Sequence, residues 1–261
     1  MSQTITLFVP CFVDQFVPQV AADMATVLRR LGYGLSFPEE QTCCGQPAFN
    51  AGFWDEARPL AEKFVGVFRH ADVIVCPSGS CTTMVRCFYP ELLASSPLRD
   101  EAVALGKRVF EFSEFLVDVA GVTDTGASFP HKVTYHDSCH LLRELHIRRQ
   151  PRELLRHVQG LELVELNFSE ECCGFGGTFA IKFPEISGAM GDVKTTHIEA
   201  SGADFVTSCD PSCLLHIEGV LRRKGARART IHLASILAAH ADAAGDHPAQ
   251  VSTMAATEVK R

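Results

Sequence analysis

Short apolar runs alternate along the chain with stretches in which apolar residues recur every three or four positions. Three runs have the length and composition of buried strands, at residues 5–10, 33–37 and 72–76. Between them, the apolar residues of 20–31 share one helical face that stops at Gly32, and those of 60–68 share another. This order is typical of βαβ units built on a mostly parallel sheet.

The alternation starts again after VAGVTDTGASFP at 119–130, a segment of small and turn-forming residues that we interpret as a linker. Further strand-like runs lie at 132–136, 162–166 and 203–208, and helix-period stretches at 152–158 and 214–224. We predict an α/β protein of two pseudo-symmetric Rossmann-like halves, residues 1–120 and 131–240. Residues 241–261 lack periodicity and are predicted to be a mobile tail.

Cysteines repeat together with this pattern. Cys11 recurs as Cys139, Cys81 recurs as Cys213, and a Cys-Cys-Gly triplet at 43–45 recurs at 172–174. The offsets are 128, 132 and 129 residues, respectively. An internal repeat of this kind predicts two sites of similar construction.

The composition is ordinary apart from these cysteines. The chain has 261 residues, 46% hydrophobic and 21% charged, as in a soluble globular protein. A net charge of -7 argues against nucleic acid as the main partner, and no run approaches the roughly 18 apolar residues of a membrane span. No export signal is visible, so we expect a cytoplasmic protein whose eleven cysteines bind metal or do redox chemistry rather than form disulfides.

The repeated cysteines follow the carboxyl ends of predicted strands. In an open α/β sheet these ends face one crevice, so three strands of each half would deliver their cysteines to one site. Zinc needs only four N or S ligands, usually from short Cys-x-x-Cys knuckles. Four or five thiolates from three loops, two of them adjacent, fit an iron-sulfur cluster better. Ten cysteines are candidate metal ligands: Cys11, Cys43, Cys44, Cys76, Cys81, Cys139, Cys172, Cys173, Cys209 and Cys213.

Longer phrases around these cysteines resemble a known family. CCGQPAFNAG, PSGSC and CCGFGGTFAIKFPEIS are similar to phrases of the lactate utilisation protein A (LutA/YkgE) group of the cysteine-rich CCG domain family, which is related to the cysteine-rich subunit of heterodisulfide reductase. The resemblance implies a subunit of a cytoplasmic complex that oxidises L-lactate to pyruvate beside partner subunits, one of them a ferredoxin-like iron-sulfur protein. It also implies that a CCG motif with five cysteines can hold a non-cubane 4Fe-4S cluster.

Cys76 and Cys209 depart from the repeat by one residue. Cys76 lies five residues before Cys81, whereas Cys209 lies four before Cys213. Members of the lactate utilisation group often lack both cysteines, and their presence brings this chain closer to the heterodisulfide reductase set. Because of this one-residue difference, Cys76 and Cys209 are not established as equivalent ligands.

Other residues near the cysteines have weaker claims. Gly45 and Gly174 would give the backbone room beside a cofactor, and His136 and His140 could donate to a cluster sulfur or carry protons, or only pack a helix start. Cys87 has no counterpart in the second half, so we interpret it as a core thiol. We interpret His146 as a surface residue. The arginines of 143–152 form either a solvated face or a face that binds a carboxylate. The glycines of 174–177 match a dinucleotide-binding motif only weakly.

The sequence therefore predicts an iron-sulfur subunit that carries electrons through one or two 4Fe-4S clusters and oxidises lactate only together with partner subunits. No flavin or nicotinamide motif accompanies the cysteines. Two alternatives stay open at this point: a heterodisulfide-reductase-like subunit that reduces a disulfide at its clusters, and a non-enzymatic zinc scaffold.

Overall fold

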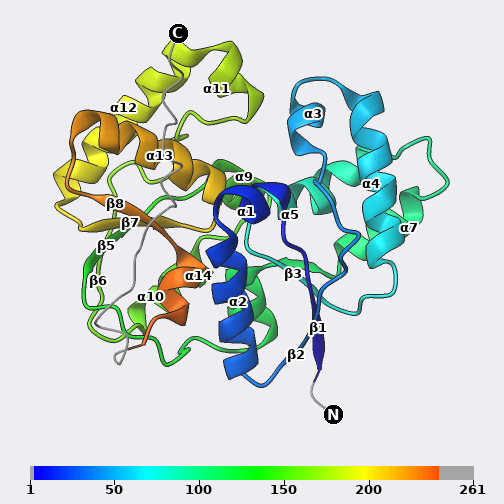
Figure 1. Cartoon of the computed structure of the whole chain (residues 1–261), viewed down its shortest axis with the longest axis horizontal. Coiled ribbons are helices and arrows are strands. Elements are labelled where there is room, and N and C mark those ends of the chain that lie inside the picture. Colours follow the sequence, from blue (N-terminus) through cyan, green and yellow to red (C-terminus); the bar gives the residue numbers. More distant parts are fainter. Residues whose placement is uncertain (1–2, 241–261) are drawn as a thin grey trace, which may run out of the picture.

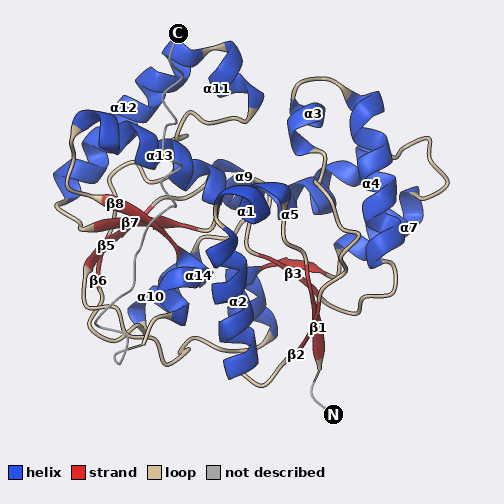
Figure 2. Cartoon of the chain, viewed as in Figure 1, coloured by secondary structure: helices blue, strands red, loops and turns tan. Residues whose placement is uncertain are grey.

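Two separate four-stranded sheets form the centre of the computed structural model, which describes residues 3–240. Their strand orders are β2-β1-β3-β4 and β6-β5-β7-β8, and every neighbouring pair is parallel. Helices flank both sheets (Figures 1 and 2). The repeated order confirms the predicted fold class, α/β with two similar halves, which we call the first half (β1–β4) and the second half (β5–β8).

The elements of the first half alternate between short strands and helices. They are β1 (Thr4–Leu7), α1 (Cys11–Phe16), α2 (Pro18–Arg30), β2 (Gly34–Ser36), α3 (Gln46–Asn50), α4 (Trp54–Phe68), β3 (Ile74–Cys76), α5 (Gly79–Thr83), the π-helical η1 (Met84–Phe88), α6 (Tyr89–Leu92), α7 (Arg99–Gly106), β4 (Val109–Glu111), α8 (Phe112–Glu114) and the π-helical η2 (Phe115–Val119). Those of the second half are β5 (Lys132–Tyr135), α9 (Cys139–Arg143), α10 (Arg149–Arg156), β6 (Glu162–Val164), α11 (Thr178–Lys182), α12 (Pro184–Ser201), β7 (Phe205–Ser208), α13 (Pro211–Lys224), β8 (Arg229–His232) and α14 (Leu233–Ala238).

All six predicted strands overlap an observed strand, but the prediction omitted the last strand of each sheet. β4 and β8 are three and four residues long and run directly into α8 and α14. Such short edge strands carry too few residues to show a periodic pattern. The predicted strand at 5–10 ends at Leu7, because Pro10 and Cys11 already belong to the start of α1.

One apolar core joins the two halves. Met24, Val27 and Leu28 of α2 are fully buried and pack in one cluster with Ile236 and Leu237 of α14. Fully burying a side chain of this size contributes about 1.5 to 3 kcal/mol. α2 and α14 therefore fasten the end of the second half onto the first, and they lie side by side in Figure 1.

Polar contacts reinforce this seam. The Arg30 guanidinium donates to the carbonyls of Thr125, Leu237 and Ala238, and the Ser235 hydroxyl donates to the Asp23 carboxylate at 2.5 Å. The chain from 120 to 131, which includes most of the predicted linker, forms neither helix nor strand apart from one isolated bridge between Ser128 and Gln159. The division into 1–120 and 131–240 stays a prediction.

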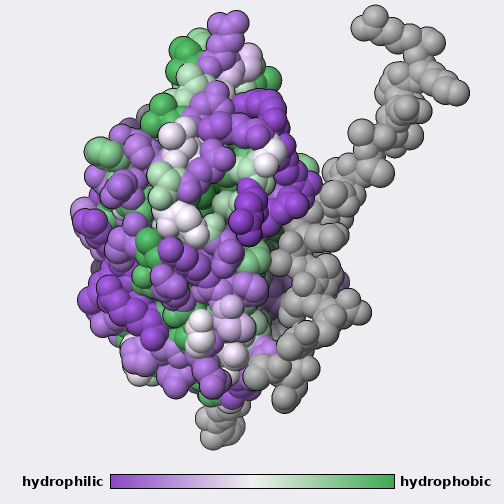
Figure 3. Space-filling model, turned by 90° about the vertical axis from the view of Figure 1, so that its left-hand side faces the viewer, coloured by the Kyte–Doolittle hydropathy of each residue, from purple (hydrophilic) through white to green (hydrophobic). Residues whose placement is uncertain are grey.

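The surface and the termini add three facts. Hydrophilic side chains predominate on the side of the molecule that carries α12 and β6, with scattered apolar positions between them (Figure 3). Within residues 3–240, every helix is too short or too polar to cross a membrane. The predicted tail at 241–261 lies outside the described residues.

Candidate metal centre

The strand order of each sheet predicts a ligand site beside its first strand. β1 lies between β2 and β3, and β5 lies between β6 and β7. The order in which the chain adds strands therefore reverses beside the first strand of each sheet, although all strands stay parallel. Ligands of open parallel sheets bind at the carboxyl ends of the strands that flank such a point. α1 begins at Cys11 shortly after β1, and α9 begins at Cys139 shortly after β5.

The two sites meet between the halves. α5 of the first half packs against α9 of the second, and α1 packs against α13 (Figure 1). These helices border a partly open cavity between the halves. Eight of the ten candidate cysteines line it: Cys11, Cys43, Cys44, Cys81, Cys139, Cys172, Cys173 and Cys213.

The cysteines of the first half form one sulfur cluster. The Cys44 thiol lies 3.5 Å from the Cys81 sulfur, and the Gly45 amide donates to the Cys43 sulfur at 3.4 Å. Hydrogen bonds from the thiols of Cys11 and Cys44 lower the pKa of Cys43 to about 3. One sulfur of the set is therefore a thiolate, the form that binds metals.

The second half repeats this arrangement. The Gly174 amide donates to the Cys172 sulfur at 3.4 Å, and hydrogen bonds from Cys139 and Cys173 lower the pKa of Cys172 to about 2. One ring nitrogen of His136 and the sulfurs of Cys173 and Cys213 all lie within 4.8 Å of one another. The duplication thus extends from the fold to the distribution of protons among the sulfurs.

Both glycines of the Cys-Cys-Gly triplets hold the backbone in a left-handed conformation. Gly45 has φ 85° and Gly174 has φ 95°. A Cβ atom on Gly174 would lie 2.6 Å from the Ser187 carbonyl oxygen, and one on Gly45 would lie 3.3 Å from that of Ala57. A larger side chain would therefore press against α4 in the first half and α12 in the second.

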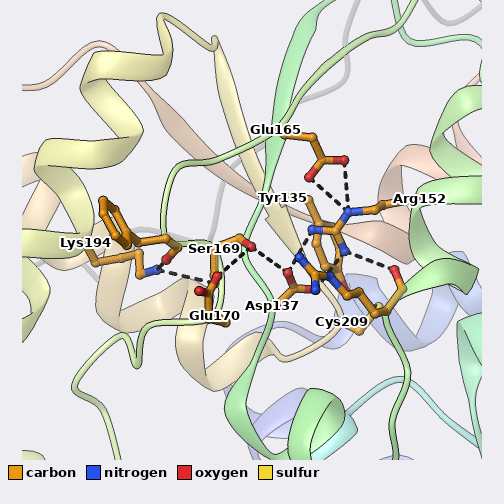
Figure 4. A network of polar contacts seen from close by, with 10 residues as sticks. Tyr135, Asp137, Arg152, Glu165, Ser169, Glu170, Lys194 and Cys209 are labelled. Carbon is orange, nitrogen blue, oxygen red and sulfur yellow. Dashed lines mark hydrogen bonds and ion pairs between the residues drawn. The ribbon is translucent and has the colours of Figure 1, made fainter.

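Cys76 and Cys209 do not line the cavity. The Cys76 thiol is fully buried and points to the Ser78 carbonyl at 3.6 Å, and burial followed by the charge of Cys81 raises its pKa. The Cys209 sulfur accepts a hydrogen bond from the Tyr135 hydroxyl at 3.3 Å (Figure 4). The role of both residues as metal ligands stays a prediction.

One pair of cavity-lining residues occupies equivalent positions in the two halves. Ser78 and Asp210 both face it, and each lies three residues before the last cysteine of its half. The Asp210 carboxylate accepts from the Ser80 amide at 2.8 Å, so the loop of the second half also fixes the loop of the first. The sequence analysis missed Asp210, although its place before Pro211 at the start of α13 marks it as a helix cap.

The two candidate histidines have different surroundings. His136 is fully buried, and neither of its ring nitrogens has a hydrogen-bond partner among residues 3–240. His140 lines the cavity, and its Nδ1 lies 3.5 Å from the Gln46 amide nitrogen. His146 is exposed, as expected, and Cys87 is half-buried at the edge of the common core.

The arginine run contains one residue that the sequence analysis misplaced. Arg152 is buried rather than solvated or free to bind a substrate carboxylate. Its guanidinium forms two 2.8 Å hydrogen bonds with the Asp137 carboxylate and also contacts Glu165 (Figure 4). Asp137 follows His136 directly, so this ion pair fixes the backbone beside the second sulfur cluster.

Comparisons with known proteins agree with the motifs. The family model of the cysteine-rich domain, CCG, matches residues 5–86 and 133–218. Lactate utilization protein A 2 of Bacillus cereus (strain 03BB102) is 42% identical over 235 residues, covering 90% of this chain and 97% of the relative. Lactate utilization protein A of Geobacillus kaustophilus is 44% identical over 234 residues, covering 89% and 98%, respectively.

The fold also has a counterpart among solved structures. A hypothetical protein from Helicobacter pylori superimposes with a TM-score of 0.62 at 13% identity, covering 95% of this chain and 50% of that one. At this identity the likeness concerns the fold alone. Both family matches coincide with the two sulfur clusters, and the chain belongs to the cysteine-rich CCG domain family as a homologue of the lactate utilization A proteins.

Proposed function

We propose that the chain is a cytoplasmic iron-sulfur subunit that carries electrons within a complex oxidising L-lactate to pyruvate. The observation that carries the proposal is the cavity between the halves, which brings two sets of four cysteines together. The names of the similar proteins supply the substrate class. The other subunits, including a ferredoxin-like iron-sulfur protein, would hold the remaining redox chemistry.

The donor set of each half fits a 4Fe-4S cluster. Four thiols from three loops converge in each set, and one member, Cys43 or Cys172, has a strongly lowered pKa. Protein-bound clusters of this kind are held by cysteine thiolates and supply one-electron transfer. The remaining thiols would lose their protons on metal binding, because the ligands must be deprotonated.

The backbone around the sulfurs is suited to the same task. The amides of Gly45 and Gly174 each donate to the first sulfur of their cysteine pair. Hydrogen bonds to ligand sulfur delocalise negative charge and raise the reduction potential of the bound centre. The glycines therefore both permit close approach and tune the site.

Metal analysis of anaerobically purified protein tests the proposal. We expect about eight irons and eight acid-labile sulfides per chain, which correspond to two 4Fe-4S clusters. The variants Cys43→Ser and Cys172→Ser should each retain about four irons, and the matched control Cys87→Ser should retain about eight. Zinc without iron or sulfide would contradict the proposal and indicate a structural zinc scaffold.

Activity distinguishes the proposed substrate from a disulfide. Combined with its partner subunits, the wild-type chain should be reduced by L-lactate, and Cys43→Ser should abolish this reduction. Reduction of a disulfide by the isolated chain, without any dependence on lactate, would instead indicate a heterodisulfide-reductase-like subunit.

A further inference from the structure

The two sulfur clusters differ in the residue that follows the first strand of each sheet. Phe8 and His136 occupy equivalent positions, since each lies three residues before the first cysteine of its half. Their backbones make equivalent hydrogen bonds, from Phe8 N to Val75 O at 3.0 Å and from His136 N to Thr207 O at 2.9 Å. A fully apolar side chain thus stands in the first half where an imidazole stands in the second.

A second exchange accompanies the first. Phe64 of α4 and Lys194 of α12 occupy equivalent positions. The glycine of each Cys-Cys-Gly triplet faces a backbone carbonyl, that of Ala57 in the first half and that of Ser187 in the second, and Phe64 and Lys194 each follow this residue by seven positions. The rings of Phe8 and Phe64 are 4.9 Å apart in a T-shaped pair. In the second half Lys194 is fully buried and donates to the carbonyl oxygens of Phe168 and Ser169 (Figure 4). A hydrophobic pair has therefore become a polar one.

His136 has the properties of a metal ligand. Leaving a buried polar group without a partner costs about 1 to 3 kcal/mol, and both nitrogens of His136 lack one within the described part of the chain. One of these nitrogens lies within 4.8 Å of the sulfurs of Cys173 and Cys213. In its neutral form an imidazole offers a free lone pair on one ring nitrogen.

We propose that His136 binds the metal centre of the second half directly through a ring nitrogen, beside Cys173 and Cys213, whereas the first half binds its centre through cysteines alone. The inference rests on the proposed function. The ring nitrogen donates its lone pair to iron, the other nitrogen keeps its proton, and no electron changes hands in this step. Imidazole ligation occurs naturally in Rieske clusters, where it raises the reduction potential above that of all-cysteine clusters.

The consequence is a chain with two unequal centres. A neutral imidazole adds no negative charge to the second centre, and the Lys194 cation lies close to it. Both effects favour the reduced form. The second centre should therefore have the higher potential and accept electrons from the first.

Isotope labelling tests the ligation without altering the protein. Wild-type chain prepared anaerobically with ¹⁵N-histidine and then reduced should show a strongly coupled ¹⁵N nucleus in pulsed electron paramagnetic resonance. The variant His136→Phe, which copies the first half, should lose this coupling and shift one of two midpoint potentials downward. The matched control His140→Phe removes the candidate histidine that lines the cavity and should retain both the coupling and the wild-type potentials.

Four results would overturn the inference. Clusters that form in the wild type without a strongly coupled histidine nitrogen would exclude ligation and leave the proposed function intact. The same holds for a coupling that persists in His136→Phe or disappears in His140→Phe. A wild-type chain that binds neither iron nor sulfide would overturn both the inference and the proposed function.

Discussion

The first and second halves share a strand order and a pattern of cysteines but differ in the material behind the sulfurs. The first cluster lies against packed aromatic rings, among them Phe8, Phe64 and Phe68. The second cluster lies against His136 and Lys194, both fully buried. The comparison shows that the same strand order can place the cysteines alike in both halves while the layer of side chains behind them differs in polarity.

The polar layer of the second half extends beyond these two residues. Asp137 takes the place of Val9, the residue after Phe8, and pairs with the buried Arg152 (Figure 4). The Ser169 hydroxyl donates to the same carboxylate at 2.8 Å, and the Ser169 carbonyl accepts from Lys194. A continuous chain of hydrogen bonds thus runs from α10 to α12 past the second cluster.

Moving the charge of the second half into the first is expected to have the largest effect. The variant Phe64→Lys places an ammonium group against the aromatic rings of Phe8, Phe68 and Tyr89, whereas the ammonium group of Lys194 donates to two carbonyls. The penalty for burying such an ion is several kcal/mol, and we expect a loss of about 5 kcal/mol or more in the free energy of unfolding. Urea denaturation of the apoprotein measures it.

The control for this variant is Phe64→Leu, which keeps the site apolar and should lose much less stability. The reciprocal variant, Lys194→Met, leaves the carbonyls of Phe168 and Ser169 without their donor and should cost about 1 to 3 kcal/mol. Equal losses for Phe64→Lys and Lys194→Met would show that the two layers do not differ as the structure indicates.

Breaking the buried ion pair of the second half is expected to have the next largest effect. Removing one partner leaves an uncompensated buried charge, which typically costs about 3 to 5 kcal/mol. Arg152→Met should therefore lower the free energy of unfolding by about 4 kcal/mol. The double variant Asp137→Val, Arg152→Met copies Val9 of the first half and should recover most of this loss. If the double variant is as unstable as Arg152→Met, the loss of stability comes from removing Arg152 itself and not from leaving the Asp137 charge without a partner.

Much of this architecture could be predicted from the sequence, because it is local. The six strands that were predicted have apolar runs of sufficient length, and the cysteine repeat follows from counting residues. The same counting pairs Phe8 with His136, so the difference between the two sites was already visible as a difference in the repeat. The resemblance to the CCG family rests on equally local phrases and is confirmed by the family match.

The remaining features depend on contacts between distant segments. The placement of Cys209 against Tyr135 and Ser113, outside the cavity, results from the approach of β7 to the first half. The burial of Arg152 depends on Asp137, which the sequence shows only as one acid among many. β4 and β8 each form beside a strand that precedes them by 35 and 24 residues, respectively, and their sequences alone do not indicate this pairing.

A last contrast concerns the final residues of β4 and β8, which both cap the helix that follows. The Glu111 carboxylate accepts from the Ser113 amide at 2.8 Å, and the His232 Nδ1 accepts from the Ala234 amide at 3.1 Å. Both side chains are buried, which favours their neutral forms. Burial raises the pKa of Glu111 to about 7 and lowers that of His232 to about 4. The two caps should therefore give the stability opposite dependences on pH.

For Glu111, the unfolded chain loses its proton near the ordinary value of 4.5 and the folded chain near 7, so stability is full below pH 4.5 and falls as the pH rises to 7. For His232, the unfolded chain gains a proton near 6.5 and the folded chain near 4, so stability is full above pH 6.5 and falls as the pH drops to 4. Each shift corresponds to about 3 kcal/mol.

The variants Glu111→Gln and His232→Asn each provide a side-chain oxygen that can accept from the helix, but neither new side chain titrates. Relative to wild type, Glu111→Gln should gain about 3 kcal/mol in the free energy of unfolding between pH 4.5 and 7, because it lacks the loss that wild type undergoes there. His232→Asn should gain a similar amount between pH 6.5 and 4. Urea denaturation of the apoproteins across roughly pH 4 to 8 measures both differences. Parallel curves for wild type and either variant would mean that the capping residue is not the buried titrating group, and the contrast between the two edge strands would then be structural only.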